Sequence, residues 1–287
     1  MIQTAKLAFY QQFKKPFFGR FMRPWRWPDD VDQEQWHRLS IDSESGSTLS
    51  ALLAHSTSDQ VKGAILMVHP MGVAAKGFWL KYGHADLLRQ AGYHVMVFDL
   101  NGFGDSTNTT MDYPLDVLSA GRHLKEMFPD LPIGLLGASM GAAMSVCAMS
   151  LPGHPFKAAV LESAFPTLLH FWSRYPIPKL GIQVSKLLYP KGERQLRPLF
   201  AASNLVSTPS LFMIYGDQDI FTPVDDGQLL WRALKQKTKT EFWQVEGADH
   251  THAYRAQPTE YSSRVVAFFN RDLAEAKVSL LSQGNNF

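Results

Sequence analysis

A serine set between glycines is the first feature of this chain with the makings of a reactive site. Ser139 lies in Gly137-Ala138-Ser139-Met140-Gly141. A serine hydroxyl is a weak nucleophile at neutral pH, and it needs a general base that is itself oriented by an acid. Further along, residues 216–223 hold two aspartates and residues 246–252 hold two histidines. A serine, an acid and a histidine are together the side chains that nucleophilic acyl transfer needs.

The residues around Ser139 predict a sharp turn between a strand and a helix. Residues 133–136 are an apolar run, as in a buried strand, and residues 140–150 are rich in alanine and methionine. Glycine at 137 and 141 leaves room for a backbone that side chains would block. We expect the helix to begin next to Ser139, where its free N–H groups favour the negative charge that develops on a carbonyl oxygen.

Apolar runs alternate with helix-like segments over most of the chain. Strands buried on both faces are predicted at residues 64–68, 95–98, 133–136, 158–161 and 210–214, with a more mixed strand at 242–245. Helices are predicted at residues 78–91, 113–128, 140–150, 224–236 and 260–273. An opening hairpin is predicted at residues 34–41 and 48–54. This alternation predicts an α/β fold with a mostly parallel central sheet, helices on both faces, and functional groups at the carboxyl ends of the strands.

An insertion of almost fifty residues interrupts this alternation between the strands at 158–161 and 210–214. Its prolines exclude a long helix, and its aromatic residues are more typical of a cap over a site than of a connector. We therefore divide the chain into an arm (residues 1–30), a domain (31–275) with a short cap insertion at about 165–205, and a tail (276–287). The candidates for the substrate pocket are Phe165, Phe171 and Trp172.

Four motifs together resemble the α/β-hydrolase family. They are the turn at Ser139, Gly216-x-x-Asp219, Gly247-x-x-His250 and residues 99–106, and the resemblance covers roughly residues 60–270. Within this family, the chain resembles serine esterases and peptidase-like bacterial members less closely. The resemblance implies an α/β-hydrolase fold, Ser139 as nucleophile, Asp219 as the acid and His250 as the base. It also implies an oxyanion hole made by the backbone N–H groups of Met71 and Met140.

Other residues compete for these roles. Asp217 and Glu162 are alternative acids, and His252 is an alternative base. Asp249 directly precedes His250, and its side chain is expected to face elsewhere. Pro70 stands where the family usually has glycine, and proline removes an N–H group, although the N–H of Met71 survives. His69, Asp99 and Asp105 are expected to brace loops.

These residues predict hydrolysis of a carboxylic ester in a small-molecule acyl substrate, with no cofactor and no metal. A peptide, thioester or lysophospholipid substrate would use the same three side chains. The alternative from another class is a non-catalytic binding module, recruited to a membrane and built on a hydrolase scaffold.

The arm differs in composition from the rest of the chain. Residues 1–28 carry six cations and no acid, together with eight bulky aromatic residues. This composition is compatible with packing on the domain and with peripheral contact to anionic lipid, and both alternatives stay open. Nucleic acid is not expected as a partner, because the body carries no basic face to extend the arm. The single Cys147, expected to be buried packing, and the absence of a long apolar run favour a cytoplasmic protein, with membrane association through the arm as an open addition.

Overall fold

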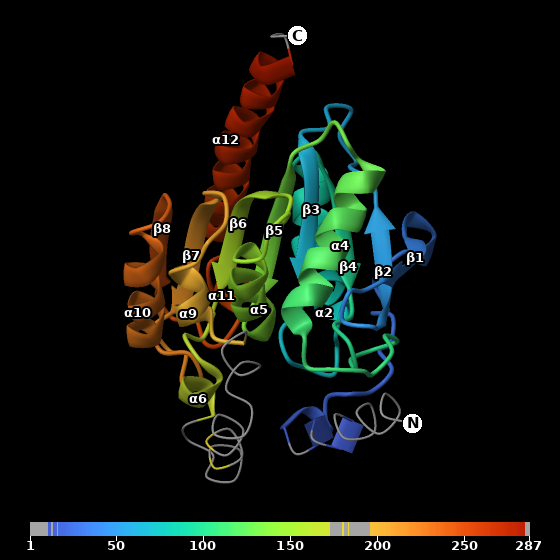
Figure 1. Cartoon of the computed structure of the whole chain (residues 1–287). Helices are drawn as coiled ribbons and strands as arrows, with labels where there is room; N and C mark the ends of the chain where they lie inside the picture. The colour runs from blue at the N-terminus through green and yellow to red at the C-terminus, as the bar shows by residue number, and fades with distance from the viewer. Residues whose placement is uncertain are drawn as a thin grey trace.

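A single eight-stranded sheet forms the centre of the computed structural model, which describes residues 11–12, 14–15, 17–172, 180, 183 and 196–284 (Figure 1). The strands lie in the order β1-β2-β4-β3-β5-β6-β7-β8. Their bounds are β1 His37–Asp42, β2 Thr48–Ala54, β3 Gly63–Val68, β4 Tyr93–Phe98, β5 Ile133–Ala138, β6 Phe156–Glu162, β7 Ser210–Gly216 and β8 Thr240–Val245. β2 runs antiparallel to both β1 and β4, and the remaining neighbours are parallel. The mostly parallel sheet predicted from the sequence is confirmed.

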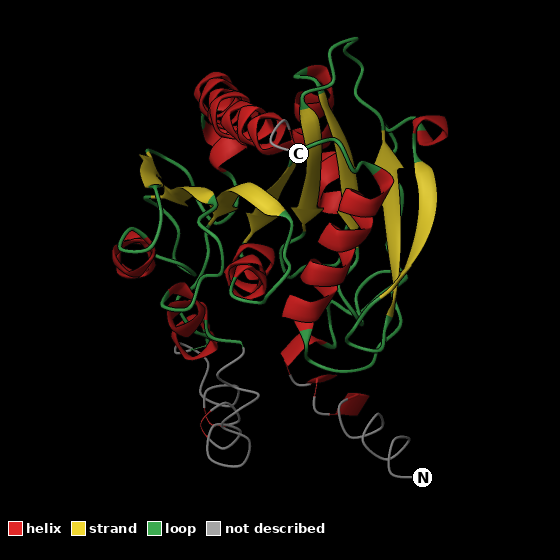
Figure 2. Ribbon diagram, turned by 45° about the horizontal axis from the view of Figure 1, so that its top comes forward, coloured by secondary structure: helices red, strands yellow, loops and turns green. Residues whose placement is uncertain are grey.

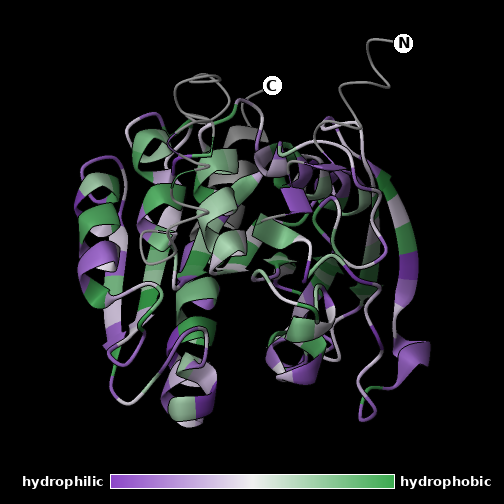
Figure 3. Cartoon of the chain, turned by 90° about the horizontal axis from the view of Figure 1, so that it is seen from below, coloured by the Kyte–Doolittle hydropathy of each residue, from purple (hydrophilic) through white to green (hydrophobic). Residues whose placement is uncertain are grey.

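Helices cover both faces of this sheet (Figure 2). The described helices are η1 Gln33–Gln35, α2 Gly77–Lys81, α3 His84–Gln90, α4 Tyr113–Met127, α5 Met140–Met149, α6 Leu168–Phe171, α9 Pro198–Ala202, α10 Val224–Leu234, α11 Ala253–Ala256 and α12 Pro258–Gly284. α4, α5 and α10 lie on one face, and α3 and α12 lie on the other. Seen from below, the helices alternate between hydrophilic and hydrophobic residues, as amphipathic helices that cover a sheet do (Figure 3).

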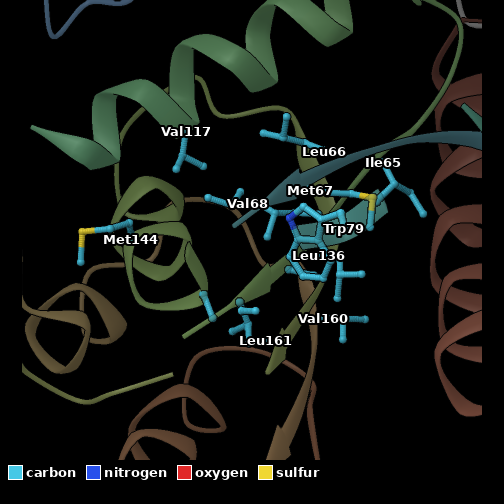
Figure 4. Packing of buried hydrophobic residues seen from close by; sticks show 14 of the residues in the cluster. Ile65, Leu66, Met67, Val68, Trp79, Val117, Leu136, Met144, Val160 and Leu161 are labelled. Atoms are coloured by element: carbon cyan, nitrogen blue, oxygen red, sulfur yellow. The ribbon is translucent and has the colours of Figure 1, made fainter. Parts of the chain in front are cut away.

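The core explains why the central strands are purely apolar. All six residues of β3 are buried, because α4 and α5 cover one side of the sheet and α2 and α3 lie on the other. Trp79 of α2 is fully buried among the side chains of the central strands (Figure 4). Burial of both sheet faces removes the alternation of polar and apolar residues that an exposed face would show.

The pairing register brings the carboxyl ends of the central strands to one level. Val68 of β3 pairs with Gly137 of β5, and Gly137 pairs with Leu161 of β6. On the far side, Gly216 of β7 pairs with Val245 of β8. The loops that follow these strands therefore start along one edge of the sheet, where the fold predicts functional groups.

Two predicted helices were wrong in extent. The segment 78–91 is two helices, α2 and α3, which separate at Gly83, where the positive φ of 76° is a conformation that glycine adopts readily. α12 continues to Gly284, beyond the predicted end at Leu273, since alanine, glutamate, lysine and leucine follow without a breaker. The predicted hairpin also begins later, at His37, because Asp32 caps the short η1 helix before it.

The arm packs on the domain in its described part. Phe17, Phe18 and Trp25 are buried in the same core as the strands. Of the cap, the structure describes α6 and α9, whereas residues 173–179, 181–182 and 184–195 lie outside the described residues. The arm and α6 lie at the same end of the molecule (Figure 1). No helix among the described residues is long and apolar enough to cross a membrane.

Candidate active site

β5 ends in a tight turn at Ser139, and α5 begins directly after it. Ser139 has φ 49° and ψ −114°, a conformation that residues with side chains rarely adopt, so the surrounding packing must hold it there. A Cβ atom at Gly141 would lie 2.1 Å from the carbonyl oxygen of Val68, at the end of β3. A Cβ atom at Gly137 would lie 2.8 Å from the Cα atom of Ala142. Close backbone approach therefore requires glycine on both sides of the turn.

Three side chains meet in a line at this turn. The Oγ atom of Ser139 lies 2.9 Å from Nε2 of His250, and Nδ1 of His250 lies 2.8 Å from Oδ2 of Asp219. His250 comes from the loop after β8 and Asp219 from the loop after β7. When the Nδ1 proton is donated to the carboxylate, Nε2 is left as the acceptor for the serine hydroxyl.

The loop after β7 holds the carboxylate of Asp219 in place. Its Oδ1 atom accepts hydrogen bonds from the backbone N–H groups of Phe221 (2.8 Å) and Thr222 (2.9 Å), and the Thr222 hydroxyl donates to Oδ2 at 2.6 Å. Burial works to raise the pKa of Asp219, but the hydrogen bond and charge of His250, with the Thr222 hydroxyl and amide, hold that pKa below its usual value. The group is therefore ionised at neutral pH and can orient His250.

The competing acids and the competing base have other partners. The carboxylate of Asp217 accepts the N–H of Gly247 at 2.8 Å, which ties the β7 loop to the β8 loop. The side chain of Asp249 lies 2.6 Å from Nδ1 of His252. Glu162 accepts hydrogen bonds from the Ala253 N–H and a tyrosine hydroxyl. His250 is thus the histidine that lies between the serine and a carboxylate.

The last residue of β6 and the residue after it support the loop that carries His250, and the sequence had not identified them in this role. Glu162 accepts the N–H of Ala253 at 3.1 Å, and the Ser163 hydroxyl accepts the N–H of Thr251 at 3.4 Å. Both contacts hold the segment that directly follows His250 in the sequence. Burial raises the pKa of Glu162 to about 6, against the lowering effect of its hydrogen bonds and of the nearby His250. In the sequence, the signal for this role is that the polar residues Glu162 and Ser163 directly follow the apolar residues of β6.

The loop after β3 carries Met71, and His69 braces it. Nδ1 of His69 lies 2.7 Å from the carbonyl oxygen of Pro70, and Nε2 accepts the N–H of Leu100 at 3.1 Å. Burial lowers the pKa of His69, so the ring is neutral and can donate and accept in this way. The bracing role expected for His69 agrees with these contacts.

The two residues whose backbone N–H groups are expected at the oxyanion hole follow neighbouring strands, β3 and β5. Met140 is the first residue of α5, where helix N–H groups have no partner within the helix. Met71 stands three residues after Val68, the residue whose carbonyl packs against Gly141. Both loops therefore lie against the turn at Ser139.

Known proteins are similar to this chain in sequence and in fold. A family model described as serine aminopeptidase, S33 (Hydrolase_4) matches residues 59–195. The solved structure of the Pyrococcus furiosus esterase Pf2001 superposes with a TM-score of 0.70, covering 87% of this chain and 97% of the esterase at 21% identity. The chain has the α/β-hydrolase fold. The acylaminoacyl peptidase of Pyrococcus horikoshii is also similar in fold to this chain, with a TM-score of 0.60 and 18% identity over 83% of this chain and 42% of the peptidase.

Two human proteins are similar to this chain in sequence. The putative protein-lysine deacylase ABHD14B of Homo sapiens is 26% identical over 216 residues, which cover 74% of this chain and 85% of ABHD14B. Protein ABHD12B of Homo sapiens is 25% identical over 167 residues, 52% of this chain. The match spans 44% of ABHD12B, less than half of that protein's length.

A buried lysine, Lys76, braces the loop after β4. Nζ of Lys76 lies 2.5 Å from Oδ2 of Asp99 and 3.2 Å from Oδ2 of Asp105. Asp99 also accepts the N–H of Asp105, so the loop folds around its carboxylate. Trp25 of the arm donates its indole N–H to Asp105 at 2.5 Å. The two aspartates act as loop braces, as expected, and the lysine and tryptophan complete a network that the sequence had not indicated.

Aromatic rings surround the imidazole of His250. The ring of Phe171 lies 6.5 Å from it, and Phe165 and Trp172 each lie 5.2 Å from Phe171, measured between ring centroids. The structure thus groups the three expected pocket residues beside the site. Phe221, which sequence reasoning missed, lies 5.3 Å from His250.

Cys147 is another potential nucleophile, and it is buried as Ser139 is. Cys147 lies inside α5, and burial raises the pKa of its thiol well above the usual value. Such a thiol is protonated and unreactive at neutral pH. Among the described residues, no three His, Cys, Asp or Glu side chains gather as metal ligands.

Proposed function

We propose that this protein is a serine hydrolase that cleaves carboxylic esters through an acyl-enzyme intermediate. The observation that carries the proposal is the line from Ser139 Oγ through His250 to Asp219, with both donor–acceptor distances below 3 Å. Ser139 is the nucleophile, His250 is the general base and Asp219 orients the imidazole. This is the arrangement that acyl transfer by a serine requires.

In the first half of the reaction, the Ser139 oxygen attacks the ester carbonyl while its proton passes to Nε2 of His250. The ionised Asp219 stabilises the imidazolium that forms. The backbone N–H groups of Met71 and Met140 donate to the oxyanion of the tetrahedral intermediate. The intermediate collapses, the carbon–oxygen bond to the alcohol breaks, and the imidazolium gives its proton to the leaving alcohol.

In the second half, water takes the place of the alcohol. His250 removes a proton from the water as it attacks the acyl-serine, and a second tetrahedral intermediate releases the carboxylic acid. The proton returns to the Ser139 oxygen. No cofactor is needed, because protons and electron pairs balance within the substrate, water and these residues.

An ester substrate is favoured by the surroundings of the site. Apolar rings of Phe171 and Phe221 flank His250, which suits an acyl chain or an apolar alcohol. The esterase among the similar structures supports the same choice. Cleavage of an amide or an acyl-lysine is the second candidate, because a similar family is described as serine aminopeptidase and a similar human protein as a putative protein-lysine deacylase.

A substrate panel tests the proposal. The full chain is assayed with p-nitrophenyl esters from acetyl to lauroyl, the matching thioesters, a lysophospholipid, aminoacyl p-nitroanilides and an acetyl-lysine peptide. The Ser139→Ala variant provides the background rate. We expect the highest kcat/KM for an oxygen ester. A higher kcat/KM for an amide than for the ester of the same acyl group would favour the second candidate, and no Ser139-dependent turnover of any substrate would favour a non-catalytic binding module.

A further inference from the structure

A continuous row of aromatic rings runs from His250 to His69 and passes through the N-terminal arm. Neighbouring centroids lie 5.2–6.5 Å apart along the whole row. In order, the rings belong to His250, Phe171, Trp172, Phe17, Phe18, Phe103 and His69. The proposed general base is at one end of the row, and the histidine that braces the loop of Met71 is at the other.

The two ends of the row lie on opposite sides of Ser139. His250 comes from the loop after β8, whereas His69 follows β3, and β5 with Ser139 lies between these strands in the sheet. The cap supplies Phe171 and Trp172, and the arm supplies the rings that connect the cap to the loop after β4. The ring centroids of Phe17 and Trp172 lie 6.1 Å apart, and the two rings are arranged edge to face. Without the arm, the wall of rings would be interrupted at this point.

Lys14, three residues before Phe17, anchors the arm. Lys14 is fully buried, and its ammonium group donates to the side chain of Asn101 and to Oδ1 of Asn108 at 3.0 Å. Asn101 is itself held by the buried carboxylate of Asp116, whose Oδ2 accepts the Asn101 side-chain amide at 2.7 Å. Burial lowers the pKa of Lys14 to about 7, against the opposing charge of Asp116.

This anchor shows that the position of the arm is specific. Burying a lysine costs free energy unless its donors are matched, so non-specific collapse of aromatic residues would leave the ammonium group in water. A polar socket for Lys14 therefore fixes the residues that follow it, including Phe17 and Phe18, at a defined place. The indole hydrogen bond from Trp25 to Asp105 fixes the other end of the same segment.

We infer that the arm is a built-in part of the substrate site: Phe17 of the arm and Trp172 of the cap form an apolar wall that sets the preference for acyl-chain length. This inference rests on the proposed function. A short acyl group reaches Ser139 without contacting this wall, whereas a long chain packs against it. Loss of the Phe17 ring therefore acts on long chains selectively.

The test compares acyl-chain preference between matched variants. Phe17→Leu removes the ring that faces Trp172, and Lys14→Met removes the anchor. Phe268→Leu is the control, because Phe268 is also buried but packs with Phe212 and Phe269, away from the arm and the cap. The measured quantity is the ratio of kcat/KM for p-nitrophenyl laurate to that for p-nitrophenyl acetate in the full chain.

The ratio falls about tenfold in Phe17→Leu and in Lys14→Met, since loss of apolar contact in a pocket changes discrimination by about this factor. It stays at the wild-type value in Phe268→Leu. An unchanged ratio in both arm variants, with active wild-type protein, would overturn the inference and leave the proposed function intact.

A binding measurement keeps the inference testable without turnover. Dodecanoate is titrated calorimetrically into Ser139→Ala protein with and without Phe17→Leu. The added substitution weakens binding about tenfold if Phe17 belongs to the wall. Equal affinity in the two proteins, or no binding to either, contradicts the inference, whereas absence of ester turnover by the wild-type chain contradicts the proposed function.

Discussion

The carboxylate of Glu162, at the end of β6, accepts the backbone N–H of Ala253, three residues after His250. Its other oxygen accepts the hydroxyl of Tyr261 at 3.2 Å. The end of one strand therefore holds the loop that carries the proposed base, although Glu162 does not contact the reacting atoms.

Replacing Glu162 with alanine leaves two buried donors without an acceptor. Each such donor costs about 1–3 kcal/mol, so we expect Glu162→Ala to lower the free energy of unfolding by about 3 kcal/mol and to reduce kcat as the His250 loop loosens. Glu162→Gln keeps an acceptor for the Ala253 N–H and is expected to lose less than about 1 kcal/mol. Urea unfolding and ester turnover measure both. Tyr261→Phe is the matched control, and equal losses in the alanine and glutamine variants would contradict the supporting role.

The raised pKa of Glu162 gives stability a definite pH dependence. The carboxyl group has a pKa of about 6 in the folded protein and 4.5 ordinarily, so between these values the folded state holds a proton that the unfolded state has released. The contribution of Glu162 to stability is thus present below about pH 4.5 and is lost as the pH rises through about 6. The stability of wild type relative to Glu162→Gln should fall by about 2 kcal/mol over this window.

The difference in the free energy of unfolding between wild type and Glu162→Gln cancels the contributions of the other titrating groups around this site. His250 and His252 face Glu162 from the loop after β8, and Tyr261 faces it from α12. Asp219 has the opposite sign, because its lowered pKa gives stability that is lost as the pH falls. Denaturation at a series of pH values from 4 to 8 measures this difference in the free energy of unfolding. A difference that stays constant or rises with pH would show that burial does not raise the pKa of Glu162.

Gly141→Ala should disrupt the turn at Ser139. The new Cβ atom would lie 2.1 Å from the carbonyl oxygen of Val68, which is backbone and cannot rotate away. Overpacking of this kind costs about 1–3 kcal/mol or more, and displacement of α5 also moves the Met140 N–H. Gly72→Ala is the control, because no atom lies within 4 Å of its added Cβ. Thermal unfolding and ester turnover should separate the two variants, and similar behaviour would contradict the close approach at Gly141.

Contact of the arm with anionic lipid stays a prediction with a specific test. While Phe17, Phe18 and Trp25 of the arm are buried, four of its cations are exposed, next to the exposed acids Asp29 and Asp30. These cations are Lys15, Arg20, Arg23 and Arg26. Each cation near an anionic bilayer contributes about 1 kcal/mol, so the triple variant Arg20→Gln, Arg23→Gln, Arg26→Gln should bind phosphatidylglycerol-containing vesicles about 100-fold more weakly.

The control for vesicle binding removes three exposed cations at the opposite edge of the sheet. Arg232, Lys235 and Lys237 lie at and beyond the end of α10, and their replacement by glutamine should leave flotation unchanged. Flotation that is equal in the two triple variants, or absent in the wild-type protein, would remove the lipid contact.

The sheet could be predicted from the sequence because its physics is local. Strands such as β3 and β5 are covered on both faces, so every residue is apolar, and the turn at Ser139 carries its glycines at positions fixed by close backbone approach. The order of Ser139, Asp219 and His250 is set by the topology of the sheet. The apolar strands and the glycines of the turn are each recognised within a few consecutive residues.

The rest depends on contacts between distant parts of the chain. No local pattern pairs Lys14 with Asn101 and Asn108, because the three groups are far apart in sequence and meet only when the arm lies on the folded domain. Phe221 likewise becomes a site residue only when the β7 and β8 loops are side by side. The break at Gly83 was missed because a helical pattern continues on both sides of it.

Covalent labelling tests whether Ser139 is the nucleophile. Wild-type protein is incubated with a fluorophosphonate, and the modified residue is identified by peptide mass spectrometry beside the Ser139→Ala variant. We expect one labelled site, at Ser139, with no labelling and no ester turnover in the variant. Retained labelling or turnover in Ser139→Ala would contradict this role.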